Sequence, residues 1–434
     1  MREKFKNLLI VLLGILMGIL MVVMLVINLS LGLEESNLRA IGQRLGFRID
    51  RGSTAITVSE PAVLPAKLAI RGPQGLYLAG GSEMEDLLGT VSPILSEALG
   101  SVGKISSISE NEFLNYLGGD HIACAFTFPV PFYLLQHWWT GETGFSSDQA
   151  ASMLAVVSKE EAVAIVFCDD STGKHYLAET AAGYERFVGQ CQAAPAGNAF
   201  YAFERDGYHM LAAHEPVWSS AVYYPTYTVA VPDFSAEGAI SDQLLSAFDI
   251  NPFLAEVYKE SDGDIVYIEG YNALQFSKDG RIHYSVTGDG GIDLEMDGLL
   301  SDKERKAHAA RRICDILEQI GAAAGCDGGF SVAGIAEQPD GWVITCERFL
   351  GGAFVTETDG YSAVVTVRGG RITGIRITLT TAAEESSARL LPIQLATALL
   401  DGSDNSFFVR YAASDGMYIP DLYSTKGGAR NGME

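Results

Sequence analysis

The chain has little cysteine and no paired cysteine motif. Its 434 residues include six cysteines, and no two of them form a Cys-x-x-Cys pair. Structural zinc sites usually take two ligands from such a pair, so we predict no metal centre. Cys124 and Cys168 lie in apolar stretches expected to form strands, where we predict buried, unreactive thiols. The spacings leave open whether any disulfide forms.

Positive charge is also scarce. Lysine and arginine total 30 against 54 aspartate and glutamate residues, which gives a formal net charge of −24. A surface of this sign repels phosphate backbones and anionic lipid headgroups, so nucleic acid is excluded as a predicted partner. Solubility accounts for the acidic balance without any specific function.

The complete signatures of acyl-transfer enzymes are missing. The sequence contains no Gly-x-Ser-x-Gly nucleophile elbow. Ser171-Thr-Gly-Lys174 and Ser101-Val-Gly-Lys104 match the Ser-x-x-Lys spacing of serine enzymes of the cell wall, and Ser403-Asp-Asn405 supplies a Ser-Asp-Asn piece. No Lys-Thr-Gly follows, and both serines fall in expected turns or loops rather than at the start of a helix. We therefore predict no catalytic residue.

The histidines are scattered rather than grouped as metal ligands. His209 and His214 lie five residues apart, whereas a His-Glu-x-x-His zinc helix needs a spacing of four with a glutamate between. Both are predicted to have surface or packing roles. Asp169-Asp170 is typical of a turn rather than of a tuned acid–base pair. The sequence therefore predicts neither a metal ligand nor a cofactor site.

A long apolar run begins close to the N-terminus. Leu8 to Ile27 contains no charged residue, and twenty helical residues rise about 30 Å, the thickness of a bilayer core. Basic residues precede the run, which predicts that the N-terminus lies in the cytoplasm and the bulk of the chain outside. No cleavage site of the Ala-x-Ala type follows the run, which predicts that it stays uncleaved as a single-pass anchor. Gly14 and Gly18 form a Gly-x-x-x-Gly pair that either contacts a partner helix or reflects ordinary glycine usage in spans.

The remainder of the chain predicts an α+β fold with antiparallel meander sheets packed on helices. Capping signals at Ser82, Ser109, Ser241 and Ser301 each precede an amphipathic stretch, with a break expected at Pro93. A helix followed by a meander appears twice, after Ser241 and after Ser301, and a last helix is expected over residues 392–402. The expected parts are a cytoplasmic tip and span (1–33), a juxtamembrane link (34–66), an N-terminal domain (67–230), two helix-plus-meander modules (231–300 and 301–424) and a tail (425–434).

The segment Tyr267–Ser285 shows the meander pattern most clearly. Leu274 and Phe276 alternate with polar residues on one strand, and Ile282 and Tyr284 do so on the next. Lys278-Asp-Gly280 is typical of the turn between them. We expect the apolar side chains to cover a helix, which makes this segment structural rather than catalytic.

An aromatic cluster, FYLLQHWW at 132–139, follows a predicted strand that runs into a proline-containing loop. Trp138 and Trp139 are candidates for an exposed docking patch for a partner protein. Aromatic side chains are also common core fillers, and the sequence leaves this alternative open.

These features together resemble the YycH/YycI family. The resemblance rests on the single N-terminal span, the strand HIACAFTFPVPFYLL, the stretch from Ser241 to Ser285, and the later strands GWVITCERF and YSAVVTVRGGRITGIRITL. Members are membrane-anchored accessory proteins of Gram-positive bacteria that modulate a sensor histidine kinase controlling cell-wall metabolism. The length is closer to that of YycH. The resemblance implies a kinase partner and no catalytic motif, and it leaves open whether a second accessory protein of the same family joins them.

The leading hypothesis is therefore a non-enzymatic, membrane-anchored regulator that acts through transmembrane and extracytoplasmic protein contacts. One alternative is an extracytoplasmic cell-wall enzyme, a serine acyl-transferase or hydrolase that uses Ser171 or Ser101. The other is a module that captures wall fragments through Trp138 and Trp139.

Overall fold

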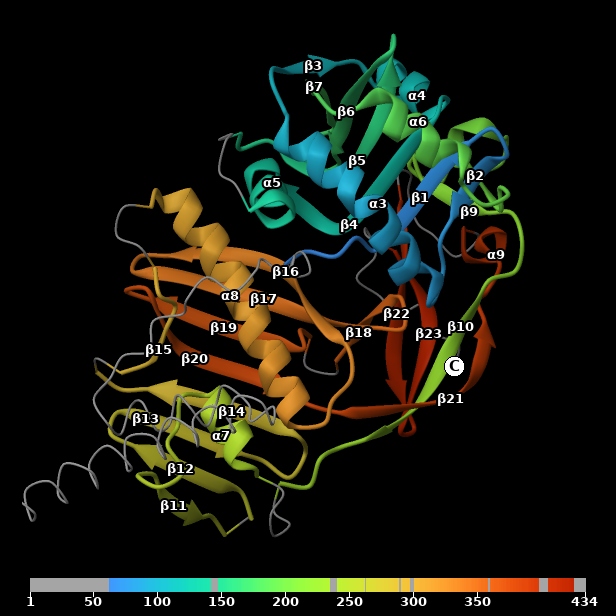
Figure 1. Cartoon of the computed structure of the whole chain (residues 1–434). Helices are drawn as coiled ribbons and strands as arrows, with labels where there is room; N and C mark the ends of the chain where they lie inside the picture. The colour runs from blue at the N-terminus through green and yellow to red at the C-terminus, as the bar shows by residue number, and fades with distance from the viewer. Residues whose placement is uncertain are drawn as a thin grey trace, which may run out of the picture. The chain divides into compact units, whose positions relative to one another are not determined.

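The structure, a computed structural model, describes residues 62–141, 147–234, 240–261, 263–288, 290–296, 300–357, 360–397 and 405–424 (Figure 1). These residues all belong to one compact unit, Glu60–Glu434. No helix among them is long and apolar enough to cross a bilayer. The predicted span, Gly14, Gly18 and the tail after residue 424 lie outside the described residues, and the single-pass anchor stays a prediction.

The N-terminal part of the described chain forms a mainly antiparallel sheet. Among the described residues it has nine strands in the order β3-β7-β6-β5-β4-β1-β2-β8-β9. Alternating and continuous apolar runs produce these strands, and β6 is buried along almost its whole length. The strands are β1 (Lys67–Gly72), β2 (Gly75–Leu78), β3 (Ile105–Ile108), β4 (His121–Pro131), β5 (Ala150–Lys159), β6 (Ala162–Asp169), β7 (Lys174–Glu179), β8 (Ala199–Tyr201) and β9 (Pro216–Trp218).

The C-terminal part forms a larger sheet, with 14 strands among the described residues. Its main path is β11-β12-β13-β14-β20-β19-β17-β18-β22-β23-β10-β21, while β15 pairs with β20 and β16 with β17. The strands are β10 (Tyr223–Ala230), β11 (Glu256–Lys259), β12 (Ile265–Glu269), β13 (Asn272–Phe276), β14 (Arg281–Val286), β15 (Ile292–Asp293), β16 (Gly329–Gln338), β17 (Gly341–Leu350), β18 (Ala353–Thr356), β19 (Ala363–Arg368), β20 (Arg371–Thr378), β21 (Thr381–Arg389), β22 (Phe407–Ser414) and β23 (Met417–Ser424).

The two predicted helix-plus-meander modules share this one sheet, because β14 of the first pairs with β20 of the second. Leu274 pairs with Tyr284 and Phe276 with Ile282, and all four side chains are buried, as the sequence predicted. The boundary predicted near residue 230 stays a prediction. β10, which precedes it, pairs with β21 and β23 of the C-terminal sheet.

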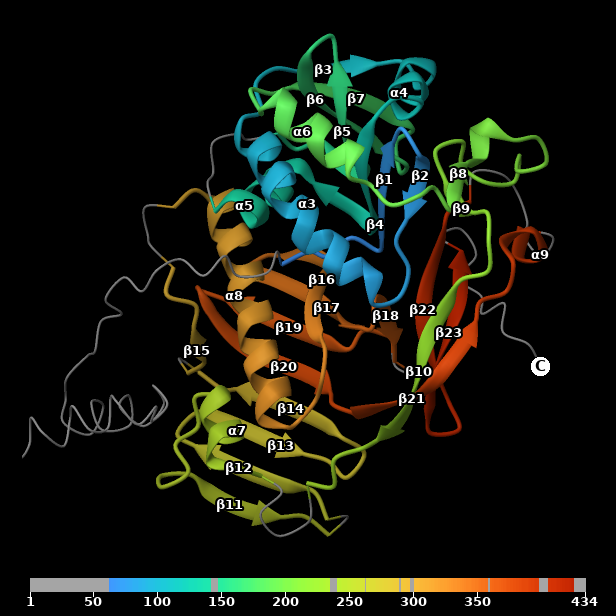
Figure 2. The same ribbon diagram turned by 45° about the vertical axis from the view of Figure 1, so that its right-hand side comes forward.

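Helices pack on the apolar faces of the sheets. They are α3 (Glu83–Gly100), α4 (Glu110–Leu117), α5 (Phe132–Thr140), α6 (Tyr184–Gln192), α7 (Asp242–Ala247), α8 (Asp302–Ala323), α9 (Ile393–Thr397) and a 3-10 turn, η1 (Ala202–Glu204). α8 lies across β16, β17, β19 and β20 (Figures 1 and 2).

Residues 62–66, the end of the predicted link, are mostly buried, and the Leu64 N–H donates to Ser331 of β16 at 2.9 Å.

The capping predictions are confirmed at three of four serines. The hydroxyls of Ser109, Ser241 and Ser301 each accept a hydrogen bond from the backbone N–H three residues later. Ser82 precedes α3 but makes no side-chain cap. The break expected at Pro93 is wrong, because α3 continues through it. The carbonyl that Pro93 leaves without a helical donor belongs to Gly89, which is exposed to water.

One further expectation is wrong. The strand from His121 was expected to run into a proline-containing loop at residues 129–135, but residues 132–140 form α5, which begins directly after Pro131 and is followed by Gly141 with φ 75°. Pro131 lies outside the helix, where its missing N–H costs no helical hydrogen bond. The last predicted helix is described only over Ile393–Thr397, and residues 398–404 lie outside the described residues.

Candidate functional site

The two tryptophans proposed as a docking patch are buried. Trp138 is 2% exposed and Trp139 is 9% exposed. The Trp138 indole N–H donates to the backbone carbonyl of Ala307 in α8 at 3.0 Å. A docking patch needs exposed area, so the position of these side chains supports a packing role between α5 and α8 instead of a contact with a partner.

The serine motifs do not assemble into a catalytic set among the described residues. The Ser171 hydroxyl donates to the Asp169 carboxylate at 2.5 Å, in the turn after β6, and Lys174 is exposed at the start of β7. The Ser101 hydroxyl donates to the Glu97 carbonyl at the end of α3. Neither serine begins a helix. Both keep the turn and loop roles that the sequence predicted.

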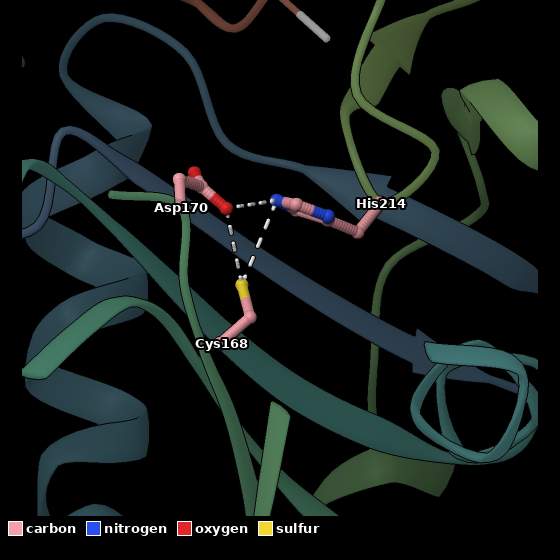
Figure 3. Close-up of side chains that lie close together, drawn as sticks. All are labelled: Cys168, Asp170 and His214. Atoms are coloured by element: carbon pink, nitrogen blue, oxygen red, sulfur yellow. Dashed lines mark hydrogen bonds and ion pairs between the residues drawn. The ribbon is translucent and has the colours of Figure 1, made fainter. Parts of the chain in front are cut away.

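A cluster of three potential metal ligands lies beside Ser171. Cys168, Asp170 and His214 point toward one another (Figure 3). The Cys168 Sγ lies 3.6 Å from His214 Nε2 and 3.6 Å from Asp170 Oδ1, and the third side of the triangle, His214 Nε2 to Asp170 Oδ1, is 3.4 Å. We refer to these three residues as the Cys-Asp-His cluster.

Two segments far apart in sequence position this cluster. Cys168 lies near the end of β6, and Asp170 follows two residues later, where the chain turns toward β7. The Asp170 N–H donates to the Ser152 hydroxyl of β5 at 3.0 Å, which fixes the backbone at the turn. His214 comes from the loop 205–215, and its ring packs edge-on against Phe113 of α4 at 5.8 Å.

The electrostatics of the cluster follow from burial and proximity. Burial raises the pKa of the Cys168 thiol, although His214 opposes that rise. Burial alone would raise the pKa of Asp170 and lower that of His214. The contacts within the cluster outweigh burial. The hydrogen bond with His214 is the main cause that lowers the pKa of Asp170, and Cys168 and Asp170 together hold the pKa of His214 well above its usual value.

The loop that carries His214 also joins the two sheets. Glu215, the next residue, forms a buried ion pair with Lys67 of β1, and its carboxylate accepts a hydrogen bond from the Phe407 N–H of β22 at 3.1 Å. Ala212 donates to the Asn405 carbonyl at 2.9 Å. Burial lowers the pKa of Lys67, and Glu215 opposes this shift. We call this set of contacts the 205–215 junction.

A cavity of about 250 Å³ opens beside the junction. Asp170 and His214 line it, whereas Cys168 lies behind them with 1% of its surface exposed. The register between β4 and β5 shifts between Ala125 and Val130, and the residues released by this bulge form part of the cavity wall. The other lining residues are Ala125, Phe126, Thr127, Phe128, Pro129, Ser152, Met153, Ser171, Glu215, Pro216, Ser406 and Phe408.

A larger cavity of about 620 Å³ lies at the β16–β17 and β19–β20 turns. It contains Trp342, acidic side chains such as Asp293 and Asp340, and the cations Arg305 and Arg371. These charges largely pair with one another: Arg305 lies 3.4 Å from Asp302, and Arg371 lies 3.8 Å from Asp293. We assign no chemistry to this cavity.

One end of the C-terminal sheet carries exposed apolar side chains. β11 is the end strand of the main path, and within the described part of the chain it pairs only with β12 (Figure 2). All four of its residues are exposed. We define the β11 edge as Phe253 (73% exposed), Leu254, Val257, Tyr258, Ile268 and Tyr271. Exposed apolar edges of this kind are typical of surfaces that contact another chain.

The burial of His121 makes the stability of the fold depend on pH. Its buried ring contacts the Gly119 carbonyl through Nδ1 and the Tyr201 hydroxyl through Nε2, and burial lowers its pKa to about 4. In the unfolded chain the pKa of this histidine is near 6.5, so the unfolded state binds a proton at a higher pH than the folded state does. The free energy of unfolding therefore falls as the pH drops from 6.5 toward 4, by up to about 3 kcal/mol from this group. Unfolding of the wild type and of His121→Gln, compared at pH 7 and pH 4.5, should show a smaller loss in the variant; equal losses would contradict this assignment.

The sequence predicts a separate role for each member of the Cys-Asp-His cluster and does not indicate that the three lie close together. Cys168 is buried as predicted, and Asp169 accepts turn hydrogen bonds from Ser171 and Thr172 as predicted. Asp170 and His214, however, come together although 43 residues separate them in the sequence. The Cys-x-Asp spacing at a strand end was the one available signal, because residues two apart share a strand face.

Comparison with known proteins gives a likeness of fold. No family model matches the chain, and no curated protein sequence matches it. Among solved structures, the chain is similar to YycH from Bacillus subtilis, with a TM-score of 0.50 at 10% sequence identity. The match covers 86% of this chain and 98% of that chain. It supports, at the level of fold, the α+β class with antiparallel sheets and the resemblance that the sequence indicated.

Proposed function

We propose that this chain is a non-enzymatic, membrane-anchored regulator that binds a sensor histidine kinase controlling cell-wall metabolism. The observation that carries the proposal is the likeness of fold to YycH over 86% of this chain and 98% of that one. The sequence resemblance to the same family rests on different features, among them the apolar N-terminal run and the strands after Ser241. The two together favour a regulatory role over the enzyme alternative.

The β11 edge is the contact surface in this proposal. An end strand leaves backbone N–H and C=O groups open to pairing with another chain, and Phe253, Val257 and Tyr271 add apolar area beside it. Glu256 and Lys259 on the same strand supply charges that set the register of a bound segment. The kinase partner contacts this edge outside the membrane, while Gly14 and Gly18 contact its span within the bilayer.

The mechanism is a coupling free energy. If the outer part of this chain binds one state of the kinase more tightly than the other, the population of that state rises by the ratio of the two affinities. A difference of about 1–3 kcal/mol between the states changes kinase output by about 5–150-fold. No chemical step on the regulator is required.

Crosslinking in intact membranes tests the surface. A photoreactive residue in place of Tyr271, which is 62% exposed, is expected to capture the kinase, whereas the same residue at Tyr361, which is 47% exposed outside the β11 edge, is the matched control. Phe253→Ser combined with Val257→Lys should lower capture by about tenfold or more without loss of folded protein, because both side chains are exposed. Equal capture from Tyr271 and Tyr361, or capture unchanged in the double variant, would remove the β11 edge from the proposal.

A further inference from the structure

We propose that the Cys-Asp-His cluster is a zinc site. The ligands would be the Cys168 thiolate, the Asp170 carboxylate and the His214 Nε2 atom, with water in the fourth position. This inference is independent of the proposed regulatory function, since it assigns a ligand to a part of the fold remote in sequence from the β11 edge.

The distances fit a tetrahedron of metal ligands. With zinc bonds of about 2.3 Å to sulfur, 2.0–2.1 Å to nitrogen and 2.0–2.2 Å to oxygen, tetrahedral angles separate sulfur from nitrogen or oxygen by about 3.6 Å, and nitrogen from oxygen by about 3.4 Å. The corresponding separations in the structure are 3.6, 3.6 and 3.4 Å. One position about 2 Å from all three atoms therefore satisfies every bond length at once.

Direct hydrogen bonding explains the same distances less well. A charged imidazole donating to a carboxylate normally contracts to about 2.7–2.9 Å. His214 Nε2 and Asp170 Oδ1 are 3.4 Å apart, although no other element separates them in Figure 3. The Cys168 thiol carries one proton and can donate it to only one of its two neighbours, Asp170 Oδ1 or His214 Nε2, which lie equally far from its sulfur. A cation between the three atoms contacts all of them at once.

The surroundings favour a metal over a reactive cysteine. Cys168 does not line the cavity and is 1% exposed, so a substrate in the cavity could not reach its sulfur. Asp170 and His214 do line the cavity, which leaves room for a water molecule on the open side of the metal. Three protein ligands with one open position are typical of zinc sites that exchange a ligand, and the mixed sulfur, nitrogen and oxygen set suits zinc.

Zinc at this position would stabilise the 205–215 junction. His214 precedes Glu215, whose carboxylate contacts both Lys67 of β1 and Phe407 of β22. A bond from the metal to His214 would join the loop to the end of β6, so that the ordering of the loop depends on zinc.

Metal analysis of the full chain tests the site. The chain should be purified in detergent without a polyhistidine tag, dialysed with ZnCl2 and a reductant, and then dialysed against metal-free buffer. We expect about one zinc per chain in the wild type. Cys168→Ser and His214→Asn should weaken binding by at least about 100-fold, since even outer-shell partners are worth about 10–100-fold. Cys124→Ser and His209→Asn are the matched controls: Cys124 is another buried cysteine of the same sheet, and His209 is exposed in the same loop.

Cobalt substitution gives a second readout that reports the ligand. Loading with CoCl2 should produce a thiolate-to-cobalt charge-transfer band in the wild type and in Cys124→Ser, and no band in Cys168→Ser. If Cys168→Ser or His214→Asn fails to fold, Asp170→Asn decides the question, because that side chain is 46% exposed and its loss should weaken zinc binding without unfolding the chain. Substoichiometric zinc in the wild type, or a band that survives in Cys168→Ser, would overturn the proposal whatever the outcome of the kinase experiments.

Discussion

Replacement of Lys67 by Met is expected to lower the free energy of unfolding by about 3–5 kcal/mol. Lys67 and Glu215 are 4% and 2% exposed, and their ion pair lies at the 205–215 junction. Removal of the ammonium leaves the Glu215 carboxylate buried, with a hydrogen bond from the Phe407 N–H but no cation beside it. An uncompensated buried charge is far more costly than the loss of a surface contact. Chemical unfolding of the purified chain, followed by tryptophan fluorescence, measures the change.

Lys159→Met is the matched control for this result. Lys159 pairs with Glu179 at 3.7 Å on the surface, where both side chains are at least 36% exposed. Its replacement should cost no more than about 1 kcal/mol. The double variant Lys67→Met/Glu215→Gln should regain part of the loss, since the amide oxygen still accepts from Phe407 and no charge is left buried. A Lys67→Met variant as stable as Lys159→Met would show that the buried pair does not hold the junction.

Replacement of Trp138 by Ala is also expected to lower the free energy of unfolding by about 3–5 kcal/mol. The side chain is almost fully buried between α5 and α8, and its indole N–H donates to Ala307. The substitution creates a cavity and removes the hydrogen bond to that carbonyl. Urea unfolding at neutral pH measures the change.

Two variants separate this packing role from a docking role. Trp138→Phe keeps most of the ring volume and should cost less, about 1–3 kcal/mol, for the part of the ring that is lost and for the missing indole hydrogen bond to the Ala307 carbonyl. Tyr271→Ala removes an aromatic ring that is 62% exposed and should change stability by no more than about 0.5 kcal/mol. Full stability of Trp138→Ala, together with reduced capture of the kinase, would restore the docking patch and contradict the packing role.

Much of the fold could be predicted because its signals are local. Ser109, Ser241 and Ser301 cap helices through hydrogen bonds that span three residues, and Leu274 with Phe276 shows the period of a half-buried strand. Such patterns need no knowledge of the rest of the chain. α5 was not predicted because Pro129 and Pro131 indicated a loop, yet Pro131 lies just outside the helix.

The long-range arrangement could not be predicted in the same way. Nothing in the two meanders indicates that β14 pairs with β20, or that β10 joins β21 and β23 across more than 150 residues of chain. The Cys-Asp-His cluster depends on the same kind of information. His214 contacts Cys168 only because the 205–215 loop folds back over the end of β6. The spacing of single histidines in the sequence does not indicate that contact.

The phosphorylation level of the kinase tests the central claim most directly. The kinase is reconstituted in proteoliposomes with the full chain, with the Phe253→Ser/Val257→Lys variant, or alone, and its autophosphorylation is followed with labelled ATP. A regulator predicts a change of at least about fivefold with the wild-type chain and little or none with the variant. Identical phosphorylation in all three samples, or turnover of a peptidoglycan precursor by the purified chain, would contradict the account.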